Sequence, residues 1–281
     1  MQVTHIVELA SILVLAFFLW MEHRGGKGGT SPVATQVKLG LTLAGCAWLT
    51  ENSCIHLYGF YYYTPTWHVM LDQVPLMVIL IWPFVILSDL KVAQGLLGAE
   101  HKLIPILTGA LVVWDASLME AVSSYSGLWW WTEPGLFEVP LIGILGWGIF
   151  TVVVLGLWRN LGPGWRVLIF VNAPLYTHLL LLAAWWGGLR YVLRGPFPDG
   201  VVVGLGWVVS FLLSWQVWRR RLRLPTSTLW PRIPAALVFF SLLWVYGRSY
   251  DALMAYTFSF APPWILLTWQ SVRGESHPLP S

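Results

Sequence analysis

The sequence has 281 residues, of which 57% are hydrophobic and only 10% are charged, and its mean hydropathy is +0.67. An average soluble domain carries roughly 25% charged residues, so the composition excludes an ordinary soluble protein and indicates a polytopic membrane protein. The net charge of +3 is a small excess, and no basic and aromatic surface motif accompanies it. We therefore expect no nucleic-acid partner.

Apolar segments of spanning length follow one another along the whole chain. A helix needs about 20 mainly apolar residues to cross a bilayer, and nine segments meet or approach that length. The eighth is short, and Pro262 and Pro263 interrupt the ninth. We therefore predict an all-α, polytopic transmembrane helix bundle of seven to nine spans, forming a single integral membrane domain over residues 1–281. The segments are 5–21, 37–58, 67–88, 103–125, 136–158, 167–189, 200–218, 233–247 and 252–270.

The basic residues predict how the bundle is oriented, because cytoplasmic loops of membrane proteins hold most of the Lys and Arg. With nine spans and the N-terminus outside, 13 of the 16 basic residues fall inside. Only Arg190, Arg194 and Arg248 fall outside. This predicts a multi-pass protein of the cell inner membrane, surrounded by membrane lipid, with a cytoplasmic C-terminus.

In that orientation Asp115 lies near the middle of the membrane, and seven other acids lie in or near its outer half: Glu8, Glu51, Asp72, Glu120, Glu133, Glu138 and Asp251. A carboxylate in hydrocarbon costs about 2–4 kcal/mol unless it faces a protein interior or a water-filled cavity, so such residues are functional candidates. The candidate catalytic acids are Glu51, Asp115, Glu120 and Glu138.

The candidate acids differ in their expected surroundings. Asp115 and Glu120 point about 140° apart on one helix, so they are alternatives unless that helix lies centrally among its neighbours. Glu138 follows Pro134 and Gly135 in the first turns of a span, where a helix N-terminus favours the ionised form. Asp115 is the deepest acid, and an apolar pocket keeps a carboxyl protonated, so we expect Asp115 to be a neutral proton donor.

Aromatic residues near these acids suggest the chemistry. A protonated carboxyl among aromatic faces suits the addition of a proton to an isolated C=C bond. Aromatic rings hold the resulting tertiary cation, at about 0.5–2 kcal/mol each, and the bundle shields it from water. An interfacial belt of Trp and Tyr is the alternative explanation. The candidate substrate-binding residues are His56, Tyr61, Tyr63, Trp114, Trp129, Trp131 and Trp147.

Other polar residues give weaker patterns. His178, with Asn172 and Tyr176 nearby, could line a polar pocket or serve as a hydrogen-bonded structural residue. The histidines form no HxxxH or HxxH cluster, and Cys46 and Cys54 lack CxxC spacing. We therefore expect no metal site and no cofactor.

The stretch from Asp115 through LWWWTEPGLFEVPLIGILGW resembles a pattern in the carotenoid-biosynthesis membrane proteins that include the carotenoid 1,2-hydratases. That pattern has an Asp in a helix, a W-x-W, and then V-P-x-x-N-F-x-G-W. Upstream, Glu51 followed by LYGFYYYT and VPLMVILIWP also matches loosely. The resemblance covers about residues 45–150, and it implies a membrane enzyme acting on a linear isoprenoid end group with Glu51 and Asp115 as the matching acids. The residues that keep the spacing of the later block are Trp129, Trp131, Val139, Pro140, Gly146 and Trp147.

The sequence departs from this pattern at three places. Gly143 and Ile144 stand where the family has Asn and Phe, Glu138 stands where a Gly precedes V-P, and Ala116 replaces a Pro after Asp115. Loss of the Asn removes a group that could position water. A cyclase, similar more distantly to membrane lycopene cyclases and membrane terpene cyclases, therefore competes with a hydratase.

The sequence thus predicts an enzyme that protonates a C=C or epoxide end group of a hydrophobic isoprenoid and resolves the cation by hydration or cyclisation, without metal or nucleotide. A membrane terpene cyclase acting on a meroterpenoid or other prenyl substrate is one alternative. A transporter or proton relay is another, which predicts acids in both leaflets and inverted repeats. A structural subunit of a pigment complex is a third.

Overall fold

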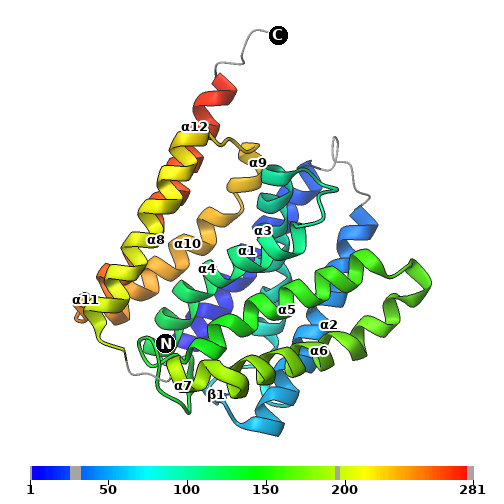
Figure 1. Cartoon of the computed structure of the whole chain (residues 1–281), viewed down its shortest axis with the longest axis vertical. Helices are drawn as coiled ribbons and strands as arrows, with labels where there is room; N and C mark the ends of the chain where they lie inside the picture. Colours follow the sequence, from blue (N-terminus) through cyan, green and yellow to red (C-terminus); the bar gives the residue numbers. More distant parts are fainter. Residues whose placement is uncertain (1, 26–32, 194–196, 277–281) are drawn as a thin grey trace.

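The computed structural model describes residues 2–25, 33–193 and 197–276, and these residues form a helix bundle (Figure 1). Seven helical segments within them are long and apolar enough to cross a membrane. Five are α1 (Val3–Gly25), α3 (Leu76–Leu97), α4 (Ile104–Tyr125), α5 (Leu141–Asn160) and α8 (Asp199–Arg220), and two are the composite segments Pro163–Leu189 and Thr226–Gly247. The predicted all-α bundle of seven to nine spans is confirmed.

The remaining helices are α2 (Val33–Tyr58) and the pair α11 (Asp251–Phe258) and α12 (Ala261–Ser276). The ninth predicted segment is therefore two helices. Pro262 and Pro263 lie in the first turn of α12, where a proline is tolerated because the backbone N–H there has no helical acceptor.

The two composite segments change helix type along their length. The first contains the 3-10 turn η1 (Pro163–Leu168), α6 (Ile169–Ala184) and the π-turn η2 (Trp185–Leu189), and α7 (Arg190–Leu193) continues from it. The second contains α9 (Thr226–Leu229), α10 (Arg232–Leu242) and the π-turn η3 (Leu243–Gly247).

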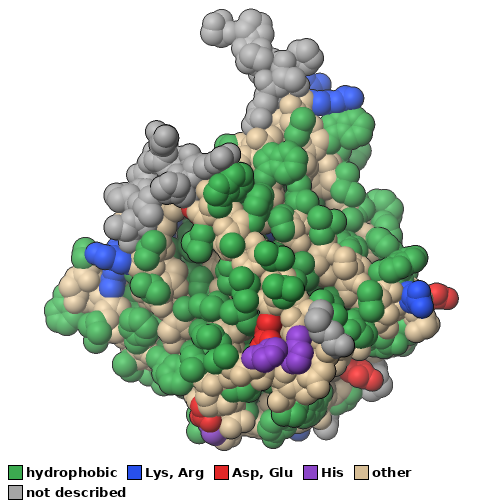
Figure 2. All heavy atoms as spheres, turned by 180° about the vertical axis from the view of Figure 1, so that it is seen from behind, with side chains coloured by type: hydrophobic (Ala, Val, Ile, Leu, Met, Phe, Trp, Pro, Cys, Tyr) green, Lys and Arg blue, Asp and Glu red, His purple; other side chains and the backbone are tan. Residues whose placement is uncertain are grey.

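The outer surface of the bundle is apolar, as expected for helices surrounded by lipid. Figure 2 shows hydrophobic side chains over most of one face, with few charged ones. In the most apolar stretch of α1, of α8 and of segment 226–247, only 22% of the residues are buried inside the bundle. Contiguous exposed apolar surface of this kind marks a membrane or partner contact, and together with the seven apolar helices it indicates an integral membrane protein.

Different helices and strands lie at the two ends of the bundle. Figure 1 shows α1 beginning at one end, close to β1 (Tyr61–Tyr63), while α9 and the end of α12 lie at the opposite end. We call these the N-terminal end and the C-terminal end of the bundle. Of the basic residues counted above, Lys27 and Arg194 lie outside the described residues.

The third predicted span is wrong at its start. Residues 67–88 were expected to be helical, but α3 begins at Leu76. Before it, β2 (Met70–Leu71) and β3 (Val74–Pro75) form a short antiparallel hairpin. The turn places Asp72 at a positive φ of 56°, a conformation that Asp tolerates better than most residues, so the chain reverses here before it enters the bundle.

The fifth predicted span also starts too early. α5 begins at Leu141, because Leu136 and Val139 exchange backbone hydrogen bonds of 2.7 and 3.0 Å that close a tight turn. Glu138 lies in that turn with a φ of 68°. Our expectation that Glu138 sits in the first turns of a helix is therefore wrong.

Helices α4 and α5 cross very closely at two glycines. A Cβ on Gly109 would lie 2.9 Å from the carbonyl oxygen of Gly148, and a Cβ on Gly148 would lie 3.0 Å from that of Gly109. Only glycine permits this approach, and small residues commonly mark close helix contacts in membranes. The crossing brings Glu120 of α4 within 2.6 Å of the indole nitrogen of Trp147 on α5.

A two-stranded sheet lies at the N-terminal end of the bundle. β1 pairs antiparallel with β4 (Trp129–Trp131), so three tyrosines face three tryptophans along the ladder. Because alternate strand residues face opposite sides, Tyr62 and Trp130 point outward, with 40% and 48% of their surface exposed. The first and last residues of each strand are more buried and face the helices.

Candidate functional site

A cavity of about 550 Å³ lies inside the bundle, walled by residues of α1 to α6, α10, α12 and the sheet. This volume is within the range of about 300–1,000 Å³ typical of small-molecule sites. Most lining side chains are apolar or aromatic. The polar and charged residues among them include Glu51, Tyr61, Tyr63, Asp115, Glu120, Ser123, Thr177, His178 and Arg232.

Glu120 accepts hydrogen bonds from three indole N–H groups. Trp147 donates to Oε1 at 2.6 Å, while Trp129 and Trp131 donate to Oε2 at 2.9 and 3.3 Å. An indole nitrogen can donate but cannot accept. The glutamate is only 3% exposed, and donors on both of its oxygens favour a carboxylate that carries negative charge.

Glu51 has a different hydrogen-bonding pattern. Its Oε2 atom accepts the hydroxyl of Tyr61 and, at 2.7 Å, the hydroxyl of Tyr63. Burial raises the pKa of both phenols well above the usual range, so the phenols stay protonated and act as donors. Both tyrosine donors thus reach the same carboxyl oxygen of Glu51.

Aromatic rings surround these two carboxyl groups. Tyr61 and Trp131, which face each other across the sheet, have ring centroids 4.7 Å apart. Tyr63 and Trp129 meet edge to face at 5.8 Å, and Trp82 of α3 stacks on Trp147. The predicted substrate-binding residues Tyr61, Tyr63, Trp129, Trp131 and Trp147 all line the cavity, and their role in binding stays a prediction.

Asp115 lines the same cavity but has other surroundings than we expected. Its Oδ2 atom pairs with the guanidinium of Arg232, whose other nitrogen lies 2.5 Å from Asp89 and 3.1 Å from the Ser88 hydroxyl. The Arg232 partner was not expected; its guanidinium favours the ionised carboxylate while burial favours the neutral form, so the neutral Asp115 stays a prediction. Arg232, which we used only to assign topology, instead turns into the bundle.

Helix α4 places Asp115 and Glu120 on the cavity wall together, although they point in different directions. It packs against α3, α5, α10 and α11, so it has neighbours on several sides and meets the condition stated for a shared chamber. Five residues of helix separate the two acids by about 7.5 Å along the axis. The cavity thus has a tyrosine and tryptophan end and an arginine end.

Three predicted site residues lie elsewhere. Trp114 packs against Phe260 with centroids 4.4 Å apart, Glu138 is exposed in the turn before α5, and His56 is bonded to Asp72. None of the three is among the cavity residues. Their nearness in sequence to the acids was misleading, because neighbouring helical residues point about 100° apart.

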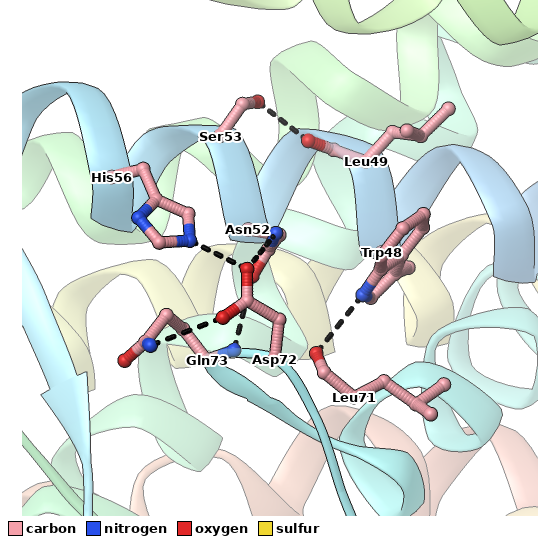
Figure 3. A network of polar contacts seen from close by, with 8 residues as sticks. All are labelled: Trp48, Leu49, Asn52, Ser53, His56, Leu71, Asp72 and Gln73. Carbon is pink, nitrogen blue, oxygen red and sulfur yellow. Dashed lines mark hydrogen bonds and ion pairs between the residues drawn. The ribbon is translucent and has the colours of Figure 1, made fainter.

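His56 belongs to a network that holds the β2–β3 hairpin against α2. Figure 3 shows His56 and Asn52 turned toward Asp72, whose Oδ2 atom accepts from them at 2.6 and 2.9 Å. Bonds from Asn52, His56 and Gln73 lower the pKa of Asp72 to about 2. Trp48 donates to the carbonyl of Leu71 at 3.1 Å. The network fixes the loop that leads from the sheet into α3.

Sequence reasoning missed Asp89, Trp82 and Arg232. For Asp89 and Arg232 the signal was a charged residue within or beside an apolar segment with no partner nearby in sequence.

No three His, Cys, Asp or Glu side chains in residues 2–25, 33–193 and 197–276 are grouped so that they could hold a metal ion.

The structure explains why no residue larger than glycine fits at Gly143 of α5. A Cβ at this position would lie 2.4 Å from the ring of Trp131. The glycine therefore lets Trp131 cross α5 and reach Glu120.

We expect Gly143→Ala to displace Trp131 and weaken its 3.3 Å bond to Glu120. Overpacking of this kind costs about 1–3 kcal/mol, which outweighs the roughly 0.5–1 kcal/mol that Ala gains over Gly in a helix. Thermal unfolding measures the change. Gly156→Ala is the matched control, since nothing lies within 4 Å of its Cβ on the same helix. Equal stability of both variants would contradict the packing argument.

The candidate site is thus a largely apolar cavity with two differently bonded glutamates at one end and an Asp–Arg–Asp cluster at the other. Comparison of the chain with protein-family models, with curated proteins and with solved structures finds no match in any of the three.

Proposed function

We propose that this chain is an integral membrane enzyme that protonates a C=C bond, or an epoxide, at the end of an isoprenoid such as a carotenoid. The cation is then resolved by hydration or by ring closure. The observation that carries the proposal is the pair Glu51 and Glu120, which face one aromatic cavity with different hydrogen-bond partners.

Glu51 is the proton donor in this proposal. Two anions that face one largely apolar cavity without a cation are unfavourable, and Arg232, the one arginine among the described residues that line the cavity, is already paired with Asp89 and Asp115. One glutamate therefore holds a proton. Glu120, with indole donors on both oxygens, is the better anion, so the proton belongs to Glu51. Tyr61 and Tyr63 then stabilise the carboxylate that remains after proton transfer.

The proton adds to the less substituted carbon of the double bond, and the positive charge develops on the tertiary carbon. The faces of Trp129, Trp131 and Trp147 attract that positive charge, and the negative charge of ionised Glu120 stabilises it further. In hydration, water bonds to the cationic carbon and loses a proton. In cyclisation, a second double bond of the substrate attacks, and a neighbouring carbon loses the proton. Either released proton restores Glu51.

A long hydrophobic substrate suits the shape of the cavity. Two of its lining residues, Leu237 of α10 and Ile265 of α12, are 62% and 63% exposed. The cavity thus reaches the outside of the bundle at these helices, where lipid surrounds the chain. An end group can enter the cavity while the rest of the molecule stays in the bilayer.

We also propose that the protein lies in the cell inner membrane with its N-terminus outside and its C-terminus in the cytoplasm. The distribution of Lys and Arg supports this orientation. The N-terminal end of the bundle, with the sheet, then faces outward, and the arginines at the end of α8 face the cytoplasm.

The test is incubation of the purified protein with a panel of linear carotenoids and shorter polyprenoids, followed by mass spectrometry. We expect a product that is heavier by one water if the enzyme is a hydratase, or an isomer of unchanged mass if it is a cyclase. No product from any member of the panel, under conditions where the protein remains folded, would refute the proposal.

The buried cluster of Arg232, Asp89 and Asp115 supports a second candidate, a transporter or proton relay, because intramembrane ion pairs often mark such pathways. Reconstitution into liposomes that contain a pH-sensitive dye separates the two functions. Proton flux that depends on Asp115, without turnover of any isoprenoid, would favour the second candidate.

A further inference from the structure

His178 of α6 lies on the cavity wall with one ring nitrogen bonded and the other without a partner. Its Nε2 atom is 2.8 Å from the hydroxyl of Ser53 on α2. Its Nδ1 atom is buried and has no hydrogen-bond partner among the described residues. The residue is only 9% exposed, and Tyr58 meets its ring edge to face at 5.4 Å.

The partners of Ser53 decide which nitrogen of His178 carries the proton. The Ser53 hydroxyl points to the backbone carbonyls of Leu49 and Thr50, at 2.5 and 3.1 Å. The nearest of these acceptors is the Leu49 carbonyl, and a Ser53 hydroxyl that donates its one hydrogen there accepts from His178. In this arrangement Nε2 holds the hydrogen, and Nδ1 of the neutral ring has a free lone pair.

A buried acceptor without a donor is costly, at about 1–3 kcal/mol, and is seldom found without a reason. The neighbouring Thr177 hydroxyl is also buried, lines the cavity and lacks a partner within the described residues. Polar atoms of two consecutive residues of one helix are thus left unsatisfied on the wall of a mainly apolar cavity. Nδ1 of His178 can accept a hydrogen bond from a small O–H group, such as water or an alcohol.

We infer that Nδ1 of His178 binds and deprotonates the water that captures the substrate cation, and that the product is a tertiary alcohol. This inference rests on the proposed function. The water oxygen bonds to the cationic carbon while one of its O–H bonds breaks, and that proton passes to Nδ1. The positive charge moves from carbon to the imidazole ring, and return of the proton to the Glu51 carboxylate completes the cycle.

His178→Gln is the sharpest variant, because the Gln amide can still donate to Ser53 but offers no lone pair at the position of Nδ1. General bases contribute about 100- to 10,000-fold to rates. We expect the product heavier by one water to fall at least ~100-fold, while isomers of unchanged mass still form. Tyr176→Phe, on the same helix but 45% exposed, is the control. Wild-type amounts of alcohol from His178→Gln would overturn the inference.

A second measurement does not depend on turnover. Nitrogen-15 NMR of the histidine-labelled protein, with His178→Gln used to identify the signal, reports which ring nitrogen carries the hydrogen. We expect the Nε2–H form, and we expect a tertiary terpene alcohol such as linalool to shift the Nδ1 resonance. An Nδ1–H form, or no response to the alcohol, would overturn the inference. Absence of product in the wild type alone would instead refute the proposed function.

Discussion

Glu51→Gln is expected to reduce product formation by the purified protein about 100- to 10,000-fold, the range typical of a lost general acid. The amide cannot release a proton to carbon, yet it retains an oxygen that can accept the hydroxyl groups of Tyr61 and Tyr63. The fold should therefore be retained. Product formation under saturating substrate, together with thermal unfolding, measures both effects.

Glu100→Gln is the control for this variant. The side chain of Glu100 is exposed in the connection between α3 and α4, so wild-type activity is expected. Equal activity of Glu51→Gln and Glu100→Gln would remove Glu51 as the proton donor and leave the aromatic cavity without an identified acid.

Arg232→Met is expected to give the largest loss of stability. It leaves the side chain of Asp89, which is 0% exposed, and that of Asp115, which is 18% exposed, without a cation. Breaking a buried ion pair by removing one partner costs about 3–5 kcal/mol. The midpoint of thermal unfolding in detergent, followed by tryptophan fluorescence, should fall on the order of 10 °C.

Neutralising the two acids should reverse that loss. The triple variant Arg232→Met, Asp89→Asn, Asp115→Asn contains no unpaired buried charge, so its midpoint should lie well above that of Arg232→Met alone. A single variant as stable as the wild type would show that the cluster contributes nothing to folding. The triple variant also distinguishes Glu51 from Asp115 as the proton donor, because a protein without Asp115 should still protonate substrate if Glu51 is the donor.

The sequence predicts much of the cavity wall correctly. The helical class follows from apolar segments of spanning length. Trp129 and Trp131 are two residues apart, and Tyr61 and Tyr63 share that spacing, so each pair faces one side once the segment is extended. The resemblance to the carotenoid family selected Glu51 and the tryptophans, which lie together in the structure.

The errors arise from contacts between residues that are distant in the sequence. Arg232 bonds Asp89 and Asp115 across 143 and 117 positions, and no local pattern indicates that pairing. It gives Asp115 a cationic partner that the sequence does not indicate. The start of α3 was misplaced for a related reason, because the hairpin before it depends on bonds from Asn52 and His56 of α2 to Asp72.

The central claim is that Glu51 transfers a proton to carbon inside this cavity. Incubating the protein with its isoprenoid substrate in D₂O and locating the label by mass spectrometry tests that claim most directly. We predict one deuterium bound to carbon in each product molecule formed by the wild type, and none above background with Glu51→Gln. Product without carbon-bound deuterium, or equal labelling by the variant, would contradict it.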